Sequence, residues 1–265
     1  MLGGVGRRDP DVAGPVARCL PSMRDCSSLC QSVVYFVRSG VMPCGVVIAM
    51  YVDVQNLGCG MKERVLFVDE ALLVAEKPAG LLSVPGRLEE NKDCLVTRLQ
   101  ADHADALTVH RLDQVTSGLM LYARGKAMQV ALSRQFEQRQ VSKRYEALVQ
   151  GLMEGETGEI DLPLICDWPN RPKQMVSYEL GKPSLTRWRV LARDVAAQTT
   201  RVELEPVTGR SHQLRLHLAS IGHPIVGDVM YDAQPAMRVC LHARRLGFVH
   251  PLTGVALEFV SDCPF

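Results

Sequence analysis

The residues best suited to acid–base or nucleophilic chemistry lie in one short polar segment, residues 109–118. Asp113 is the only carboxylate in this segment, and His110, Arg111 and Thr116 lie within three residues of it. An aspartate can act as a nucleophile or a general base, and a neighbouring cation keeps it ionised at neutral pH. The same residues would also form a turn in which Asp113 and Thr116 bind backbone amides. The segment by itself therefore leaves a catalytic and a capping role open.

A second polar cluster, residues 208–217, is rich in cations. Its basic residues are Arg210, His212, Arg215 and His217. We predict that a helix begins here with Ser211 as its N-cap, so that free backbone amides favour an anion such as an RNA phosphate. Two histidines without a carboxylate or thiol ligand beside them make a poor metal site. The cluster is better suited to face a buried carboxylate, because such a group needs a cation to stay ionised.

A third cluster, residues 167–174, places Trp168 beside Arg171 and Lys173 in a loop that contains two prolines. An aromatic surface next to cations suits the stacking of unpaired RNA bases. The alternative is a surface loop in which Trp168 packs as a lid on the core. The residue pattern alone does not separate these two interpretations.

These clusters need a scaffold, and the remaining sequence predicts mostly strands. Short apolar runs between glycines and prolines predict strands at residues 65–67, 72–75, 118–123, 145–149, 188–192, 200–204, 239–241 and 256–260. Apolar residues at helical spacing predict helices at residues 126–138 and 211–221. Helices long enough for parallel crossovers are too few for an α/β fold. The expected fold class is therefore α+β, with a mixed, mostly antiparallel sheet and flanking helices.

The chain divides by composition near residue 60. Residues 1–60 show no sustained helical or strand period and hold five of the nine cysteines. We expect them to form an unstructured or poorly ordered extension, and residues 61–265 to form the folded domain. As a hypothesis, the functional protein begins at Met61. The cysteines are not arranged in CxxC pairs, so neither a disulfide framework nor a metal site is expected.

The net charge of +1 excludes a strongly basic tail, but it hides local segregation. Residues 107–145 sum to +5 and residues 167–193 to +4, whereas residues 146–166 sum to −5. Two basic blocks could therefore hold a polyanion on one face. No secretory signal starts the chain, and its most apolar stretch, residues 33–52, is interrupted by Arg38. We expect a soluble, cytoplasmic protein without membrane contact.

Five segments, taken together, resemble the RluA family of pseudouridine synthases. In chain order, the matching motifs are residues 77–81, 110–118, 143–147, 209–228 and 241–254. The resemblance covers essentially all of residues 61–265 and implies a mixed, mostly antiparallel sheet with an active-site cleft across it. Many relatives carry an N-terminal S4 domain, whereas residues 1–60 have no S4-like helical pattern.

The resemblance implies an isomerisation that needs no cofactor. A uridine is flipped out of a folded RNA, its bond between N1 and C1′ is broken, the base turns, and a bond between C5 and C1′ is made. The implied catalytic residues are Asp113, Tyr145 and Arg215: Asp113 forms a covalent adduct with the sugar or the base, Arg215 keeps it ionised, and Tyr145 stacks on the base and helps to remove the C5 proton. Arg111 would fill the gap that the flipped nucleotide leaves. The full set of predicted RNA-binding residues is His110, Arg111, Lys143, Trp168, Arg171, Lys173, Arg210 and His212.

Residues 80–90 and 161–174 narrow the resemblance to a subgroup that modifies both 23S ribosomal RNA and transfer RNA. The expected substrates are stem-loops of both RNAs, including the anticodon stem-loop, and the expected enzyme is a monomer. Two rival interpretations stay open. One is an RNA-binding protein of the same fold that has lost catalysis. The other is a hydrolase that uses Asp113 with His212 and releases free uracil.

Overall fold

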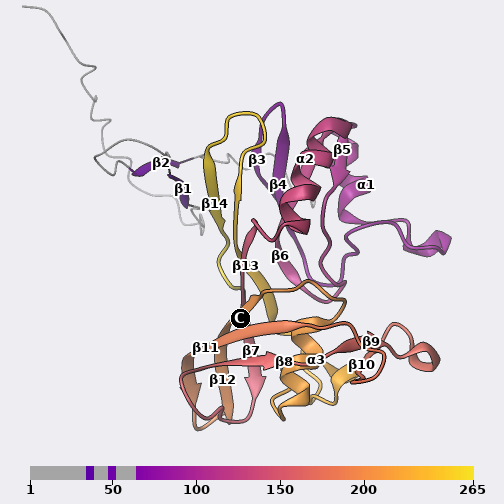
Figure 1. Cartoon of the computed structure of the whole chain (residues 1–265), viewed down its shortest axis with the longest axis vertical. Helices are drawn as coiled ribbons and strands as arrows, with labels where there is room; N and C mark the ends of the chain where they lie inside the picture. Colours follow the sequence, from indigo (N-terminus) through magenta and orange to yellow (C-terminus); the bar gives the residue numbers. More distant parts are fainter. Residues whose placement is uncertain (1–33, 39–46, 52–63) are drawn as a thin grey trace, which may run out of the picture. The chain divides into compact units, whose positions relative to one another are not determined.

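The computed structural model describes residues 34–38, 47–51 and 64–265, and within them a 12-stranded mixed sheet dominates (Figure 1). The main path of the sheet runs through β2 (Val47–Tyr51), β1 (Val34–Arg38), β14 (Ala256–Val260), β13 (Leu241–Val249), β7 (Ser142–Gln150), β12 (Thr199–Pro206), β11 (Leu185–Asp194) and β8 (Thr157–Asp161). Neighbours along this path are antiparallel. A separate two-stranded sheet consists of β9 (Leu164–Cys166) and β10 (Gln174–Val176).

A second branch of the sheet leaves β13 through its only parallel pairing among the described strands. The branch contains β6 (Ser117–Arg124), β4 (Leu72–Lys77), β3 (Arg64–Val68) and β5 (Ala106–Thr108). At the parallel contact Gly118 has φ +115°, and a Cβ there would lie 2.3 Å from the Ala243 carbonyl oxygen. Only glycine allows this approach. The contact anchors the end of the segment that contains Asp113 against β13.

In the described part of the chain, three α-helices and three short 3₁₀ helices flank the sheet. Their bounds are α1 (Leu95–Gln100), α2 (Gly125–Glu137), α3 (Gln213–Ser220), η1 (Glu89–Asn91), η2 (Trp168–Asn170) and η3 (Val229–Tyr231). Leu132 of α2 packs in a core cluster with Leu119 and Leu121 of β6. Leu214 and Leu218 of α3 pack in another. The predicted α+β fold class is confirmed.

The predicted elements differ from the structure mainly at their boundaries. Helix α2 begins one residue before its expected start. The strand expected at residues 239–241 is wrong: the Cys240 amide donates to the Val226 carbonyl in a connection, and β13 begins only at Leu241. Local apolarity indicated burial there, whereas strand pairing is set by the distant β7 and β14. Helix α1 and the strands β1, β2, β5, β8, β9 and β10 were not expected.

The expected extension, residues 1–60, is described only in part. Its described segments are the strands β1 and β2, and β1 pairs with β14. The rest of the extension and Met61 lie outside the described residues, so the proposed domain boundary stays a prediction. No helix in the described part of the chain is long and apolar enough to cross a membrane.

Candidate active site

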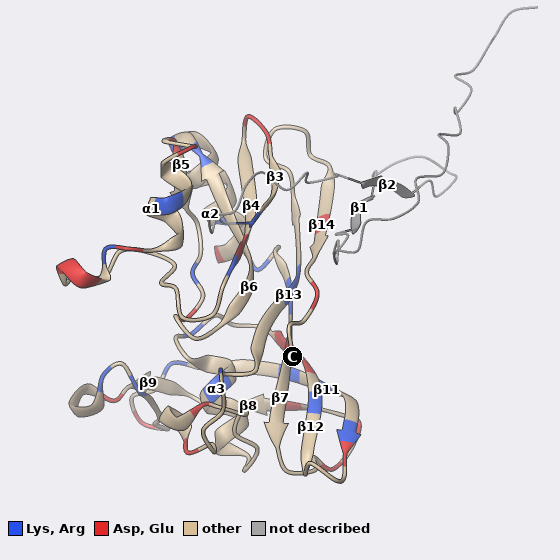
Figure 2. Ribbon diagram, turned by 180° about the vertical axis from the view of Figure 1, so that it is seen from behind, with Lys and Arg blue, Asp and Glu red and all other residues tan. Residues whose placement is uncertain are grey.

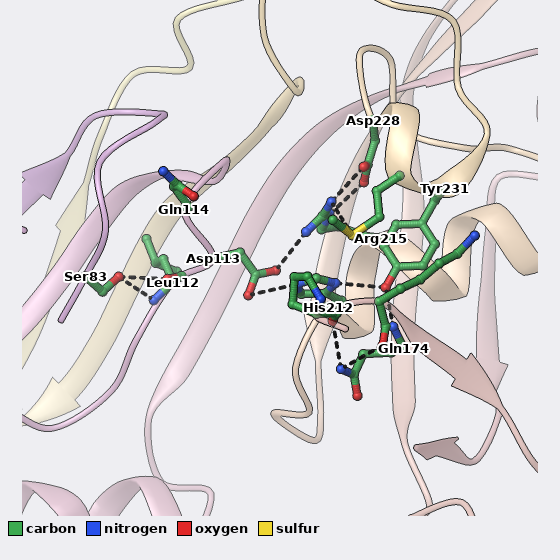
Figure 3. A network of polar contacts seen from close by, with 12 residues as sticks. Ser83, Leu112, Asp113, Gln114, Gln174, His212, Arg215, Asp228 and Tyr231 are labelled. Carbon is green, nitrogen blue, oxygen red and sulfur yellow. Dashed lines mark hydrogen bonds and ion pairs between the residues drawn. The ribbon is translucent and has the colours of Figure 1, made fainter. Parts of the chain in front are cut away.

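A cleft of about 780 Å³ brings the first two polar clusters together with β7. Asp113, Tyr145 and Arg215, the three predicted catalytic residues, all line it. Pockets of this size are typical of small-molecule and nucleotide-sized ligands. Residues from three distant stretches of sequence therefore meet in one place. Figure 3 shows the polar contacts of Asp113, His212 and Arg215.

The carboxylate of Asp113 faces one nitrogen donor with each of its oxygens. Its Oδ2 lies 3.7 Å from Nη1 of Arg215, and its Oδ1 lies 4.0 Å from Nε2 of His212. Both distances exceed a hydrogen bond, so Arg215 influences Asp113 through its charge and His212 through the orientation of its ring. The Asp113 side chain retains 18% exposure, which leaves it accessible to a bound substrate.

Arg215 is itself held by a buried carboxylate that our sequence analysis did not assign to the site. Its Nε and Nη2 donate to the two oxygens of Asp228 at 2.6 and 2.7 Å. Burial opposes the charge of Arg215, but the hydrogen bond and the charge of Asp228 outweigh it and raise its pKa. This bidentate pair fixes the plane of the guanidinium. Arg215 therefore presents Nη1 to Asp113 from a rigid position.

His212 approaches Asp113 from the turn before α3. It is the N-cap of α3 in a left-handed conformation, φ 52°, so the prediction of Ser211 as N-cap is wrong. The turn is held by the Gln213 side chain, which accepts hydrogen bonds from the Arg210 amide and the Thr208 hydroxyl. The strained backbone of His212 aims its ring at Asp113.

The backbone around Asp113 is clamped on both sides by one neighbouring segment. The Ser83 hydroxyl donates to the Leu112 carbonyl at 2.7 Å and accepts from the Leu112 amide. The buried Lys77 ammonium donates to the Gln114 carbonyl at 3.0 Å. Burial lowers the pKa of Lys77 to about 7, against the raising effect of Asp113. Lys77 and Ser83 thus position Asp113. From the sequence, Lys77 was noted only as part of the motif at residues 77–81.

Tyr145 lies on β7, opposite Ala243 of β13 and Leu204 of β12. Burial and the negative charge of Asp113 raise the pKa of its hydroxyl above the ordinary value. The phenol is therefore protonated at neutral pH. Tyr145 lines the same cleft as Asp113.

His110 lines the cleft and also takes part in packing. Its Nε2 accepts the Leu121 amide at 2.9 Å, and its ring stacks on Phe136 with centroids 4.7 Å apart. Burial, with a smaller effect of Lys143, lowers its pKa to about 3. The neutral imidazole joins the Asp113 segment to β6. Its expected contact with RNA stays a prediction.

Three predicted RNA-binding cations, Arg111, Lys143 and Arg210, line the cleft. Arg111 and Arg210 are exposed, whereas Lys143 is half-buried, and burial together with Arg139 lowers its pKa. Arg139 also lines the cleft and was not singled out from the sequence. The opening is therefore bordered by positive charge.

The basic block at residues 167–193 is partly neutralised by acidic neighbours (Figure 2). Its ion pairs are Arg187 with Glu159, Arg189 with Glu203 and Arg193 with Glu156. Exposed pairs of this kind contribute at most about 1 kcal/mol each, so an RNA phosphate can compete for the arginines. Positive and negative charges are therefore less separated in the folded structure than along the sequence.

The loop that contains Trp168 lies outside the lining of the cleft. Trp168 is 65% exposed, and the Arg171 guanidinium lies 4.5 Å from its ring centroid. This exposure contradicts the alternative in which Trp168 packs as a lid on the core. The Lys173 ammonium lies 5.7 Å from the Tyr231 ring, and the Gln174 amide donates to the Tyr231 hydroxyl. The loop therefore meets the site through Tyr231.

The residues offer little for a metal ion. No group of three or more His, Cys, Asp or Glu side chains suited to a metal occurs among the described residues. The described cysteines, Cys94, Cys166, Cys240 and Cys263, are free thiols.

Comparison with known proteins agrees with this geometry. The chain is 49% identical over 205 residues to the dual-specificity RNA pseudouridine synthase RluA of Escherichia coli K12. The aligned residues make up 76% of this chain and 93% of that protein. It is 50% identical over 206 residues to the RluA of Yersinia pestis, covering 76% of this chain and 99% of the relative.

A solved structure extends the comparison to the fold. Human RNA pseudouridylate synthase domain containing 1 has a TM-score of 0.65 and 27% identity, covering 80% of this chain and 87% of that chain. The model of the RNA pseudouridylate synthase family matches residues 71–220, a range that contains Asp113, Tyr145 and Arg215. The predicted resemblance is confirmed, and the chain belongs to the RNA pseudouridylate synthase family, whose members are isomerases.

Proposed function

We propose that this protein converts uridines to pseudouridine in stem-loops of both 23S ribosomal RNA and transfer RNA, including the anticodon stem-loop. The observation that carries the proposal is the Asp113 carboxylate in the cleft, with Arg215 facing one oxygen and His212 the other. Support for the two substrates comes from the identity to the dual-specificity RluA proteins. We also propose that residues 61–265 form the catalytic domain and that the enzyme acts as a monomer in the cytoplasm.

In the proposed reaction a flipped uridine enters the cleft and Asp113 acts as the nucleophile. Its carboxylate adds to the sugar or the base, and the bond between N1 and C1′ breaks as the electron pair moves to the uracil. The base turns, and C5 bonds to C1′ as Asp113 leaves. The C5 proton is then lost while N1 gains a proton, which restores the double bond between C5 and C6. No electrons enter or leave, and atoms balance without a second substrate. Arg215 keeps Asp113 ionised and oriented.

RNA binding would use the cations at the opening of the cleft. Arg111 fills the gap left by the flipped base, and Lys143 and Arg210 bind phosphates. Flipping costs a few kcal/mol and costs least where bases are already unstacked. A stem-loop is therefore the favoured substrate. His110 supports this surface from within, and His212 completes it beside Asp113.

Tyr145 is proposed to stack on the target base and to help remove the C5 proton. Tyr145→Phe keeps the ring and removes the hydroxyl, so turnover should fall by about 100-fold or more while RNA affinity changes little. Single-turnover release of tritium from C5-labelled RNA measures the first effect, and equilibrium binding measures the second. Unchanged release would mean that the hydroxyl has no part in proton removal.

The exposed Trp168 loop is proposed to bind the RNA outside the cleft, with Trp168 stacking on a base. Replacing both Arg171 and Lys173 by alanine should weaken binding and reduce the slope of log affinity against log salt by about 0.7 to 0.9 per lost phosphate contact. Arg245→Ala is the matched control, since Arg245 pairs with Glu258 on the β13–β14 hairpin. A slope equal to that of the control would place this loop away from the RNA.

The proposed pair of substrates is tested by mapping pseudouridines. Ribosomal RNA and transfer RNA from cells that lack the gene are incubated with the full chain, and the new pseudouridines are located in each. We expect new sites in both RNAs. Modification of only one RNA class would contradict the dual specificity while leaving the isomerase activity intact.

A further inference from the structure

Two residues of one short turn hold the two groups that face Asp113. Asp228, the N-cap of η3, binds Arg215, and Tyr231, the last residue of η3, binds His212 (Figure 3). Arg215 and His212 in turn face the two different oxygens of Asp113. The orientation of the carboxylate therefore depends on this turn. The contact of Asp228 with Arg215 is an ion pair. The contact of Tyr231 with His212 also determines where a proton lies.

The hydroxyl of Tyr231 has only one proton to donate, and its surroundings decide where that proton goes. The backbone N–H of Gln174 lies 3.0 Å from the hydroxyl oxygen. A backbone N–H can only donate, so the hydroxyl oxygen accepts this hydrogen bond. His212 Nδ1 lies 2.8 Å from the same oxygen. Tyr231 is 2% exposed, so solvent is not an alternative acceptor. The hydroxyl proton is therefore satisfied only if it is donated to Nδ1 of His212.

This hydrogen bond fixes the tautomer of His212. If Nδ1 accepts, the proton of the neutral imidazole is on Nε2. Nε2 is the nitrogen that lies 4.0 Å from Oδ1 of Asp113, so an N–H points towards the carboxylate. In the other tautomer, a lone pair would face the carboxylate and repel it.

The protonation states agree with this geometry. Burial lowers the pKa of His212, although Asp113 and Asp228 oppose this effect and Arg215 and Arg111 add to it, so the ring is neutral at pH 7. Burial raises the pKa of Tyr231 to about 12, so its hydroxyl keeps its proton.

We infer that Tyr231 is a positioning residue for the isomerisation: its hydroxyl fixes the tautomer and direction of His212, so that Nε2–H faces Asp113. The inference rests on the proposed function of Asp113 as the nucleophile. It gives Tyr231 a role that lies outside the set of groups touching the substrate. It also means that His212 turns an N–H towards Asp113, which is more specific than a general RNA contact.

Tyr231→Phe is the central variant, because it keeps the ring that lies 5.1 Å from the Arg215 guanidinium and removes only the hydroxyl. The kcat should fall by about 10-fold to 100-fold, since a misdirected group near the reacting atoms has effects of this size. KM and the affinity for RNA should change less than threefold. A variant that keeps the kcat of the natural chain overturns the inference.

His212→Gln separates positioning from a merely structural effect. Glutamine can direct its amide N–H towards Asp113 without help from Tyr231, so Tyr231→Phe should have little further effect on kcat in the His212→Gln background. Equal losses in both backgrounds would show that Tyr231 acts only through stability and would contradict the inference. Asp113→Asn, measured in parallel, tests the proposed function. An active Asp113→Asn variant contradicts the proposed role of Asp113 as the nucleophile. An inactive Asp113→Asn variant together with a fully active Tyr231→Phe variant contradicts only the inference about Tyr231.

The natural chain offers a test that needs no variant to fold. Nitrogen-15 NMR of labelled histidine reports which ring nitrogen carries the proton. We expect His212 to show a protonated Nε2 and an unprotonated Nδ1 at pH 7. The opposite tautomer would overturn the inference.

Discussion

Asp113→Asn is expected to abolish turnover and leave RNA binding intact. Asparagine has nearly the same shape but cannot form the covalent adduct, so kcat should fall by at least about 10⁴-fold. The cleft is bordered by Arg111, Lys143 and Arg210, so loss of one negative charge there should not weaken binding to a polyanion. Single-turnover kinetics and equilibrium binding to the same stem-loop measure the two effects.

The control for this variant is Asp262→Asn, which changes an exposed aspartate outside the cleft. It should match the natural chain in both assays. Turnover by Asp113→Asn within tenfold of the natural rate would exclude Asp113 as the nucleophile. Loss of both turnover and binding would instead indicate that the carboxylate organises the RNA-binding surface.

The second large effect is expected from Asp228→Asn, which removes the charge that neutralises Arg215. Both side chains of this pair are at most 4% exposed. A buried cation without its partner costs about 3 to 5 kcal/mol of stability. The nearest other carboxylate is Asp113, 3.7 Å away. Arg215 is then free to turn towards Asp113 and to form a direct ion pair that quenches the nucleophile.

Denaturant unfolding should therefore show a loss of about 3 kcal/mol in the free energy of unfolding, and turnover should fall by about 100-fold. Glu258→Gln is the matched control, because Glu258 forms an exposed pair with Arg245 at 3.4 Å. It should cost less than about 1 kcal/mol. Equal stability losses in the two variants would show that the Arg215–Asp228 pair contributes little net energy.

Which residues meet in the cleft could be predicted well because their identity is local. The single carboxylate of residues 109–118 and the cations of residues 208–217 could be read directly, and the structure brings Asp113, His212 and Arg215 together. Short apolar runs between glycines and prolines also predicted many of the described strands. From the sequence we could therefore predict the types of the residues in the site and the regular elements with a clear apolar pattern.

The groups that hold the reacting residues could not be read in this way. Asp228 reaches Arg215, and Tyr231 reaches His212, through a connection after α3 that has no helical or strand period. Lys77 fixes the Asp113 segment from a distant strand. These contacts depend on tertiary packing, so residue spacing gives no signal for them.

Release of tritium from RNA labelled at C5 of uridine tests the central claim most directly. The full chain is incubated with a labelled stem-loop, and released tritium, free uracil and RNA length are measured together. We predict that tritium is released while the RNA stays intact and no uracil appears, and that Asp113→Asn releases none. Free uracil would indicate a hydrolase that uses Asp113 and His212. Tight binding without release by the natural chain would indicate an RNA-binding protein, and either result would contradict the isomerase.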